Sequence, residues 1–132
     1  MNDLQRLQHL GFAHCGAWQF DGVSAIDFAL HFTPEGKNVL YAFVSDTEIL
    51  YVGKTVQGLH KRLYGYKRPG PTQSTNIHAN SLILKRLSNS SVEIYVWACD
   101  GLMTYGGFRV DLAAGLEDAI VHDLQPVWNK RK

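Results

Sequence analysis

The sequence predicts an α+β fold, a small antiparallel or mixed β-sheet with helices packed on its faces. Two runs rich in β-branched and aromatic residues, 39–44 and 49–54, flank a short polar turn, which is typical of a β-hairpin. Helical and strand-like patterns lie on both sides of this hairpin without a boundary between them. At 132 residues the chain can bury one core, so we expect a single domain over 1–132.

The segment before the hairpin, 1–37, is expected to contain one helix and two strands. Asn2 is placed to cap a short helix with leucines along one side, and Gly11 to end it. Apolar and polar residues then alternate at 17–20 and 24–32, which predicts strands that extend the sheet.

The hairpin carries Tyr41 and Tyr51 at similar distances from its turn. A loop with an odd number of residues would pair the two tyrosines on one face of the sheet, and a four-residue loop would place them on opposite faces. The sequence leaves both arrangements open. A helix over 56–66, with Thr55 as its N-cap, is expected to follow, and the Pro-rich stretch 67–71 must be a loop.

The rest of the chain predicts two helices and a strand. Apolar spacing favours a helix over 80–87, and alternation favours a half-buried strand over 91–97. Asp111 is expected to cap a final helix that Pro126 stops.

The composition excludes several classes of protein. No apolar run is long enough to span a membrane and no signal segment opens the chain, so we expect a cytoplasmic protein. Cys15 and Cys99 lack metal-site spacing and are expected to be reduced structural thiols. A P-loop is excluded because Glu48 stands where its first glycine is required.

Charge is distributed unevenly, although the formal net charge is only +1. No Asp or Glu occurs over 49–92. A basic face of this kind is typical of a protein that binds phosphate backbones, and a solvated helix face is the alternative. The candidate substrate-binding residues of this segment are Gly53, Lys54, Lys61, Lys67, Arg68, His78, Lys85 and Arg86.

These patterns together resemble the GIY-YIG nuclease family. Val39-Leu40-Tyr41 stands where Gly-Ile-Tyr would, with Val39 departing from the first glycine, and Tyr51-Val52-Gly53 matches Tyr-Ile-Gly. The resemblance spans 38–129, the expected catalytic core, and the size and layout resemble the small single-domain members. Three further family positions follow in order, at Arg62, Glu117 and Asn129.

The resemblance implies an endonuclease that hydrolyses phosphodiester bonds of double-stranded DNA, one strand per active site. Tyr41 would position or deprotonate the water, and Tyr51 would share that role or bond a phosphate oxygen. Arg62 offers a permanent cation with a fork suited to phosphate. Tyr66, one helical turn later, would act in proton transfer or phosphate binding. His78 could instead supply an imidazole, and the alternatives are that it contacts DNA or begins a helix.

The resemblance also implies that Glu117 is the sole protein ligand of a Mg²⁺ ion, for which Mn²⁺ could substitute. One carboxylate with waters and substrate oxygens suits this hard cation. The alternative is that Glu117, like its neighbour Asp118, is a rim residue. Asn129 would bond phosphate or orient the helix end, or serve as a structural plug for the terminus.

A runner-up interpretation is a DNA-binding or interaction protein on the same fold without cleavage activity. A short nuclease with one site would need two copies to cut both strands at once. We therefore expect a homodimer or a higher even oligomer, with the strands before Pro34 and the aromatic stretch 103–108 as candidate interfaces. Sequence preference and biological role do not follow from these patterns.

Overall fold

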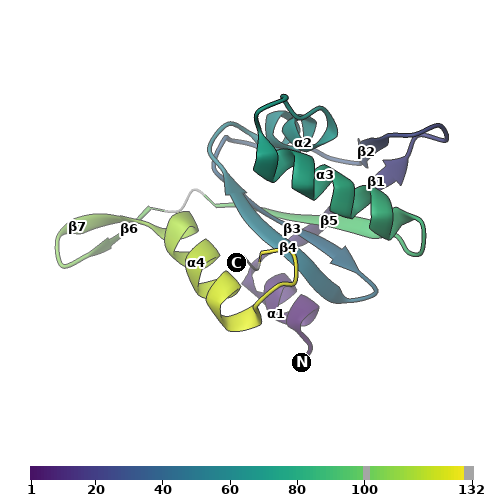
Figure 1. Ribbon diagram of the computed structural model, residues 1–132. Coiled ribbons are helices and arrows are strands. Elements are labelled where there is room, and N and C mark those ends of the chain that lie inside the picture. The colour runs from purple at the N-terminus through teal and green to yellow at the C-terminus, as the bar shows by residue number, and fades with distance from the viewer. Residues whose placement is uncertain (100–101, 130–132) are drawn as a thin grey trace.

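A computed structural model describes residues 1–99 and 102–129 (Figure 1). Five strands form one antiparallel sheet in the order β2-β1-β5-β3-β4, and β6 pairs with β7 in a separate hairpin. Within the described ranges, no helix combines the length and the apolar character needed to cross a membrane. The elements are α1 (Asp3–Leu10), β1 (Ala13–Phe20), β2 (Ile26–Leu30), β3 (Val39–Ser45), β4 (Glu48–Thr55), α2 (Leu59–Lys67), α3 (Ser74–Leu87), β5 (Val92–Ala98), β6 (Leu102–Tyr105), β7 (Phe108–Asp111) and α4 (Leu112–Leu124).

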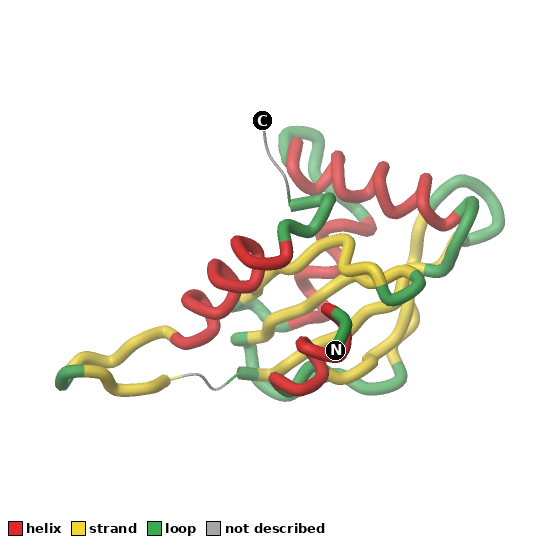
Figure 2. Tube along the Cα trace, turned by 90° about the horizontal axis from the view of Figure 1, so that it is seen from below, coloured by secondary structure: helices red, strands yellow, loops and turns green. Residues whose placement is uncertain are grey.

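The sheet is covered on both faces, so the predicted α+β architecture is confirmed. Helices α2 and α3 lie over one face, and α1 and α4 pack against β3 and β4 from the other face (Figures 1 and 2). All seven residues of β3 are buried, because this strand lies between β5 and β4 and beneath helices on both sides. The two faces form two separate apolar cores.

The hairpin of β3 and β4 brings its two tyrosines to one face through a β-bulge, which the sequence did not predict. Its turn has two residues, Asp46 and Thr47, both with left-handed backbone at φ 51° and 68°. An even turn alone would pair Ala42 with Tyr51 and send the ring to the wrong face. The register shifts between Phe43 and Val44, so that Phe43 pairs with Tyr51 instead. Tyr41, which pairs with Gly53, then shares a face with Tyr51.

The expected caps at both ends of the chain are confirmed. The Asn2 side chain accepts a hydrogen bond from the Gln5 amide at 2.8 Å, and Gly11 ends α1 with φ 130°. The Asp111 carboxylate accepts one from the Ala114 amide at 3.1 Å and caps α4. The two early strands are also present, as β1 and β2.

The predicted starts of the two middle helices were wrong. Thr55 is the buried last residue of β4, and its hydroxyl accepts from the Gln57 amide instead of capping a helix. Gly58, with φ 92°, turns the chain so that α2 begins at Leu59. Helix α3 begins at Ser74 and not at residue 80. The prediction missed its first two turns because most of their residues are polar and show no helical apolar spacing.

The β6–β7 hairpin extends away from the rest of the molecule (Figures 1 and 2). Its turn is Gly106-Gly107, where both residues have positive φ. Tyr105 and Phe108 beside the turn are 78% and 77% exposed. The sequence indicated an aromatic stretch here but no strands.

Candidate active site

Three of the predicted site residues form one hydrogen-bonded cluster between β3, which carries Tyr41, and α2, which carries Arg62 and Tyr66. The hydroxyl groups of Tyr41 and Tyr66 lie 2.7 Å apart. Arg62 donates from Nε to the Tyr41 hydroxyl at 3.1 Å and from Nη2 to the Tyr66 hydroxyl at 2.8 Å. Its guanidinium carbon also lies 4.1 Å from the centre of the Tyr66 ring, a cation–π contact. We refer to Tyr41, Arg62 and Tyr66 as the phenol–guanidinium cluster.

Gly53 is required where it stands because the cluster lies against its backbone. A Cβ atom at this position would be 2.6 Å from the ring carbon and hydroxyl of Tyr41 and 2.9 Å from Tyr51. Real Cβ contacts are not that short, so any larger residue would displace both rings. The third residue of the Tyr-Val-Gly motif therefore makes room for the tyrosines and need not touch a ligand itself.

Burial controls the protonation of the clustered phenols. Desolvation raises the pKa of Tyr41 well above that of a free phenol, nearby Tyr51 adds to this, and Arg62 opposes it only in part. Desolvation raises the pKa of Tyr66 in the same direction. Tyr41 is 1% exposed and Tyr66 is fully covered. In this conformation both residues are therefore neutral hydrogen-bonding groups that orient Arg62.

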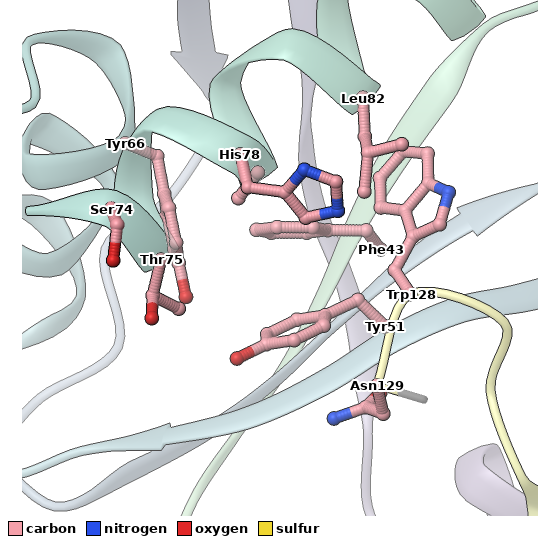
Figure 3. Close-up of a pocket in the computed structure, with 10 residues that line it drawn as sticks. Phe43, Tyr51, Tyr66, Ser74, Thr75, His78, Leu82, Trp128 and Asn129 are labelled. Atoms are coloured by element: carbon pink, nitrogen blue, oxygen red, sulfur yellow. The ribbon is translucent and has the colours of Figure 1, made fainter. Parts of the chain in front are cut away.

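Tyr51 shares a face of the sheet with Tyr41 and lines a cavity of about 240 Å³ (Figure 3). It is half-buried, whereas Tyr41 does not reach the cavity. His78 on α3 enters from the opposite wall, and Trp128 and Asn129 close the end nearest the C-terminus. Tyr66 also lines the cavity but is fully covered, so Tyr51 is the more accessible of the two phenols. The other lining residues are Phe43, Tyr66, Ser74, Thr75, Ala79 and Leu82.

Glu117 lies on α4, the helix that packs against the edge strand β4. It is half-buried near the backbone amide of Lys54, whereas Asp118 is exposed. Desolvation raises the pKa of Glu117, and the Lys54 charge and amide lower it by less. The two neighbouring acids, which helix phase alone could not separate, therefore have different environments.

Asn129 binds the same edge of β4. Its amide oxygen accepts from the Val52 N–H and its amide nitrogen donates to the Val52 carbonyl, both at 2.8 Å. The Trp128 N–H donates to the Leu50 carbonyl, also at 2.8 Å. Asn129 thus pairs with β4 as a strand would, which favours the structural alternative for this residue.

The segment 49–92, which contains no Asp or Glu, does not form an uncompensated basic face. In the folded protein, acids from outside the segment lie next to three of its cations. Lys67 lies 2.9 Å from Asp27. Arg86 lies 3.5 Å from Glu48. Lys54 lies 3.8 Å from Asp111. The exposed cations Lys61, Arg68 and Lys85 form no ion pair within the described part of the chain.

The candidate site offers a metal ion one carboxylate ligand, that of Glu117. Within residues 1–99 and 102–129, no group of three or more His, Cys, Asp or Glu side chains could enclose a cation. Glu117 fits a Mg²⁺ ion that keeps most of its water, because such an ion needs only one or two protein carboxylates. The residues present therefore fit the expected metal, with Glu117 as its ligand.

Sequence reasoning missed Asn76, which accepts a hydrogen bond from Arg62 Nη1 at 3.1 Å. It also missed the aromatic cavity walls Phe43 and Trp128. Asn76 lies in the polar first turn of α3, which the apolar spacing did not reveal. The acid-free stretch around it was the available signal, but it did not single out an uncharged side chain.

We expect Glu117 to cost stability when it is ionised. Its pKa is raised in the folded state, so the folded protein binds its proton more tightly than the unfolded chain does, and ionisation favours unfolding. Glu117→Gln should therefore raise the melting temperature at pH 7, and this gain should shrink to nothing as the pH falls below the ordinary carboxyl pKa of 4.5. Thermal unfolding between pH 4 and 8, with exposed Asp118→Asn as the control, measures this. An equal gain at all pH values would refute it.

Comparisons with known proteins place the fold among solved nucleases. No protein-family model and no curated protein matches the chain. It superposes on bacteriophage T4 EndoII, solved as a glutamate-to-alanine mutant, with a TM-score of 0.73 and 23% identity over 98% of this chain and 99% of that one. It superposes on restriction endonuclease HPY188I in complex with product DNA with a TM-score of 0.57 and 14% identity, over 100% of this chain and 84% of that one. The nuclease resemblance inferred from motif order is therefore confirmed at the level of the fold, and so is the likeness to a small single-domain member, which was inferred from size and layout.

Proposed function

We propose that this protein is a metal-dependent endonuclease of the GIY-YIG type that hydrolyses double-stranded DNA, one strand per active site. The observation that carries the proposal is the phenol–guanidinium cluster, on a sheet whose fold is shared with two endonucleases, together with the half-buried Glu117 near Lys54, the residue after Gly53. A permanent cation, a reachable phenol and one carboxylate are the groups that phosphodiester hydrolysis requires.

The cation of the site is Arg62. A guanidinium has five N–H groups, and three of them bond Tyr41, Tyr66 and Asn76. The other two make no hydrogen bond to a described residue and would be available to the oxygens of a phosphate. As the attacking water adds to phosphorus and the bond to the leaving oxygen breaks, these N–H groups would stabilise the negative charge on the other oxygens.

The phenol that meets the substrate in this proposal is Tyr51. It lines the cavity, whereas Tyr41 is buried behind it with its proton retained. Tyr51 would orient the attacking water or bond a phosphate oxygen, and His78 on the facing wall would contact the same substrate. Tyr41 and Tyr66 would keep Arg62 in place.

Glu117 would hold the Mg²⁺ ion, with Mn²⁺ as a substitute. The ion, when bound there, would add positive charge beside the phosphate and the leaving oxygen. The protein contributes the half-buried carboxylate, whose desolvation strengthens its attraction for a divalent cation.

Duplex DNA would lie along α2 and α3, where Lys61, Arg68 and Lys85 are exposed. Lys54, Lys67 and Arg86 could join them only by exchanging an acidic partner for a phosphate. The charge contribution to DNA binding should therefore be smaller than the seven cations of 49–92 suggest.

Cleavage of plasmid DNA is the primary test. Wild type should nick or cut duplex DNA with Mg²⁺ or Mn²⁺ and fail with EDTA. Glu117→Ala should abolish cleavage but keep DNA binding, while Asp118→Ala, which changes the exposed neighbouring acid, should cut normally. Cleavage by Glu117→Ala at the wild-type rate would refute the metal assignment. Binding without cleavage by wild type would support the runner-up, a DNA-binding protein on the same fold.

The two hairpin tyrosines give a second test. Each Tyr→Phe change keeps the ring and removes the hydroxyl, so folding should survive. Tyr51→Phe should lower kcat by roughly the 10²–10⁴ of a group that acts on the reacting atoms. Tyr41→Phe should lower kcat less, because Arg62 keeps its bond to Tyr66. Single-turnover cleavage rates measure both, and a larger loss for Tyr41→Phe would transfer the catalytic role to the buried phenol.

We also propose that two copies associate through the β6–β7 hairpin. An isolated two-stranded hairpin is marginally stable in water, and this one exposes Met103, Tyr105 and Phe108. Light scattering at micromolar concentration should show a homodimer or a higher even oligomer. The Tyr105→Ser, Phe108→Ser double variant should be monomeric and only nick plasmid. A monomeric wild type would remove this part of the proposal.

A further inference from the structure

Arg62 has a third anchor that the cluster alone does not explain. Its Nη1 donates to the side-chain oxygen of Asn76 at 3.1 Å, across the space between α2 and α3. The guanidinium is therefore fixed on two sides, by the phenols from the sheet side and by the amide from α3. A planar group with bonds along two of its edges can neither rotate about its axis nor tilt freely.

Asn76 is itself fixed by the loop before α3. Its side-chain nitrogen donates to the side-chain oxygen of Gln73 at 3.2 Å, and that oxygen also accepts from the Gly70 amide at 2.9 Å. The orientation of the Asn76 amide follows from its neighbours. Arg62 only donates and the Gln73 oxygen only accepts, so the Asn76 oxygen must face Arg62 and its nitrogen must face Gln73.

An amide at this position differs from a carboxylate in one respect that matters for phosphate binding. Both accept a hydrogen bond from a guanidinium, but a carboxylate would also cancel its charge. Asn76 orients Arg62 and leaves its full positive charge, with two N–H groups still unused by the described side chains.

We infer that Asn76, fixed by Gln73, is a further positioning residue, which together with the two phenols aims Arg62 at the scissile phosphate. The inference rests on the proposed nuclease function for its consequence, but the positioning itself can be observed without DNA. Because a small misplacement of a charge-stabilising group can cost about 10²-fold in rate, loss of this anchor should affect catalysis far more than folding.

Two substitutions separate orientation from charge. Asn76→Ala removes the anchor and leaves the charge, so kcat should fall by about 10²-fold, while the salt dependence of duplex binding in EDTA stays unchanged. Asn76→Asp keeps a hydrogen-bond acceptor for Arg62, but its carboxylate forms an ion pair that cancels the positive charge of Arg62. The log–log salt slope of duplex binding should then fall by about one unit, with cleavage lost.

The matched control is Asn80→Ala, one turn further along α3. Asn80 also joins α3 to α2, but it donates to backbone carbonyls, to Tyr66 at 2.8 Å and to Lys67 at 3.3 Å. Asn80→Ala should lower the melting temperature without changing the Arg62 side chain. If Asn76 were only another structural link, Asn76→Ala would behave in the same way.

The deciding measurement is the Nη1–H resonance of Arg62, the group that bonds Asn76, in ¹⁵N–¹H spectra at low temperature, identified by its loss in Arg62→Lys. In wild type it should be ordered and should shift with inorganic phosphate. In Asn76→Ala it should become mobile, and in Asn80→Ala it should not change. An equally ordered resonance in Asn76→Ala would overturn the inference. Failure of wild type to cut DNA would overturn the proposed function and leave the resonance result standing.

Discussion

The free edge of β4 is the constraint on which the candidate site depends. An edge strand presents unpaired backbone groups that need partners, and here the C-terminal part of the chain supplies them. The Leu50 carbonyl bonds Trp128, both Val52 groups bond Asn129, and Glu117 lies near the Lys54 amide. Leu50, Val52 and Lys54 alternate along the strand with Tyr51 and Gly53. The bonds that cover the edge therefore hold Asn129 against the strand that carries Tyr51, and Glu117 lies near the same strand at Lys54.

The phenol–guanidinium cluster concentrates polar groups where an apolar core would be more stable. Arg62 is partly desolvated, and the cost is offset only because its donors meet Tyr41, Tyr66 and Asn76. The ring of Phe43 packs against both phenol rings, and the burial of the two tyrosines strengthens the electrostatic interactions of their hydroxyl groups. The arrangement gives a cation whose direction is fixed before any ligand arrives, which is the condition for electrostatic stabilisation without reorganisation.

Sequence patterns predicted the elements whose signals are local, and failed where distant residues decide the outcome. The Asp111 cap and the tyrosine hairpin could be predicted because capping and alternation involve neighbours in the chain. The bulge before Tyr51 could not, since nothing in the turn specifies an extra residue in one strand. The ion pair of Lys67 with Asp27 could not be predicted from the distribution of acids along the chain, because it joins residues far apart in sequence. Asn76 was missed because a polar first turn conceals the start of a helix.

The closure of β4 by later residues also sets an order in which the site can form during synthesis. The hairpin, Arg62 and Asn76 leave the ribosome well before Glu117 and Asn129, and at 5–20 residues per second the delay is on the order of seconds. During that time the phenols and the cation can assemble without the carboxylate, and the open strand edge can pair wrongly with another chain. A nascent chain would therefore lack a complete site for DNA and would be vulnerable to aggregation through its open strand edge. Docking of α4 and the residues after it would complete the site and cover the edge at the same time.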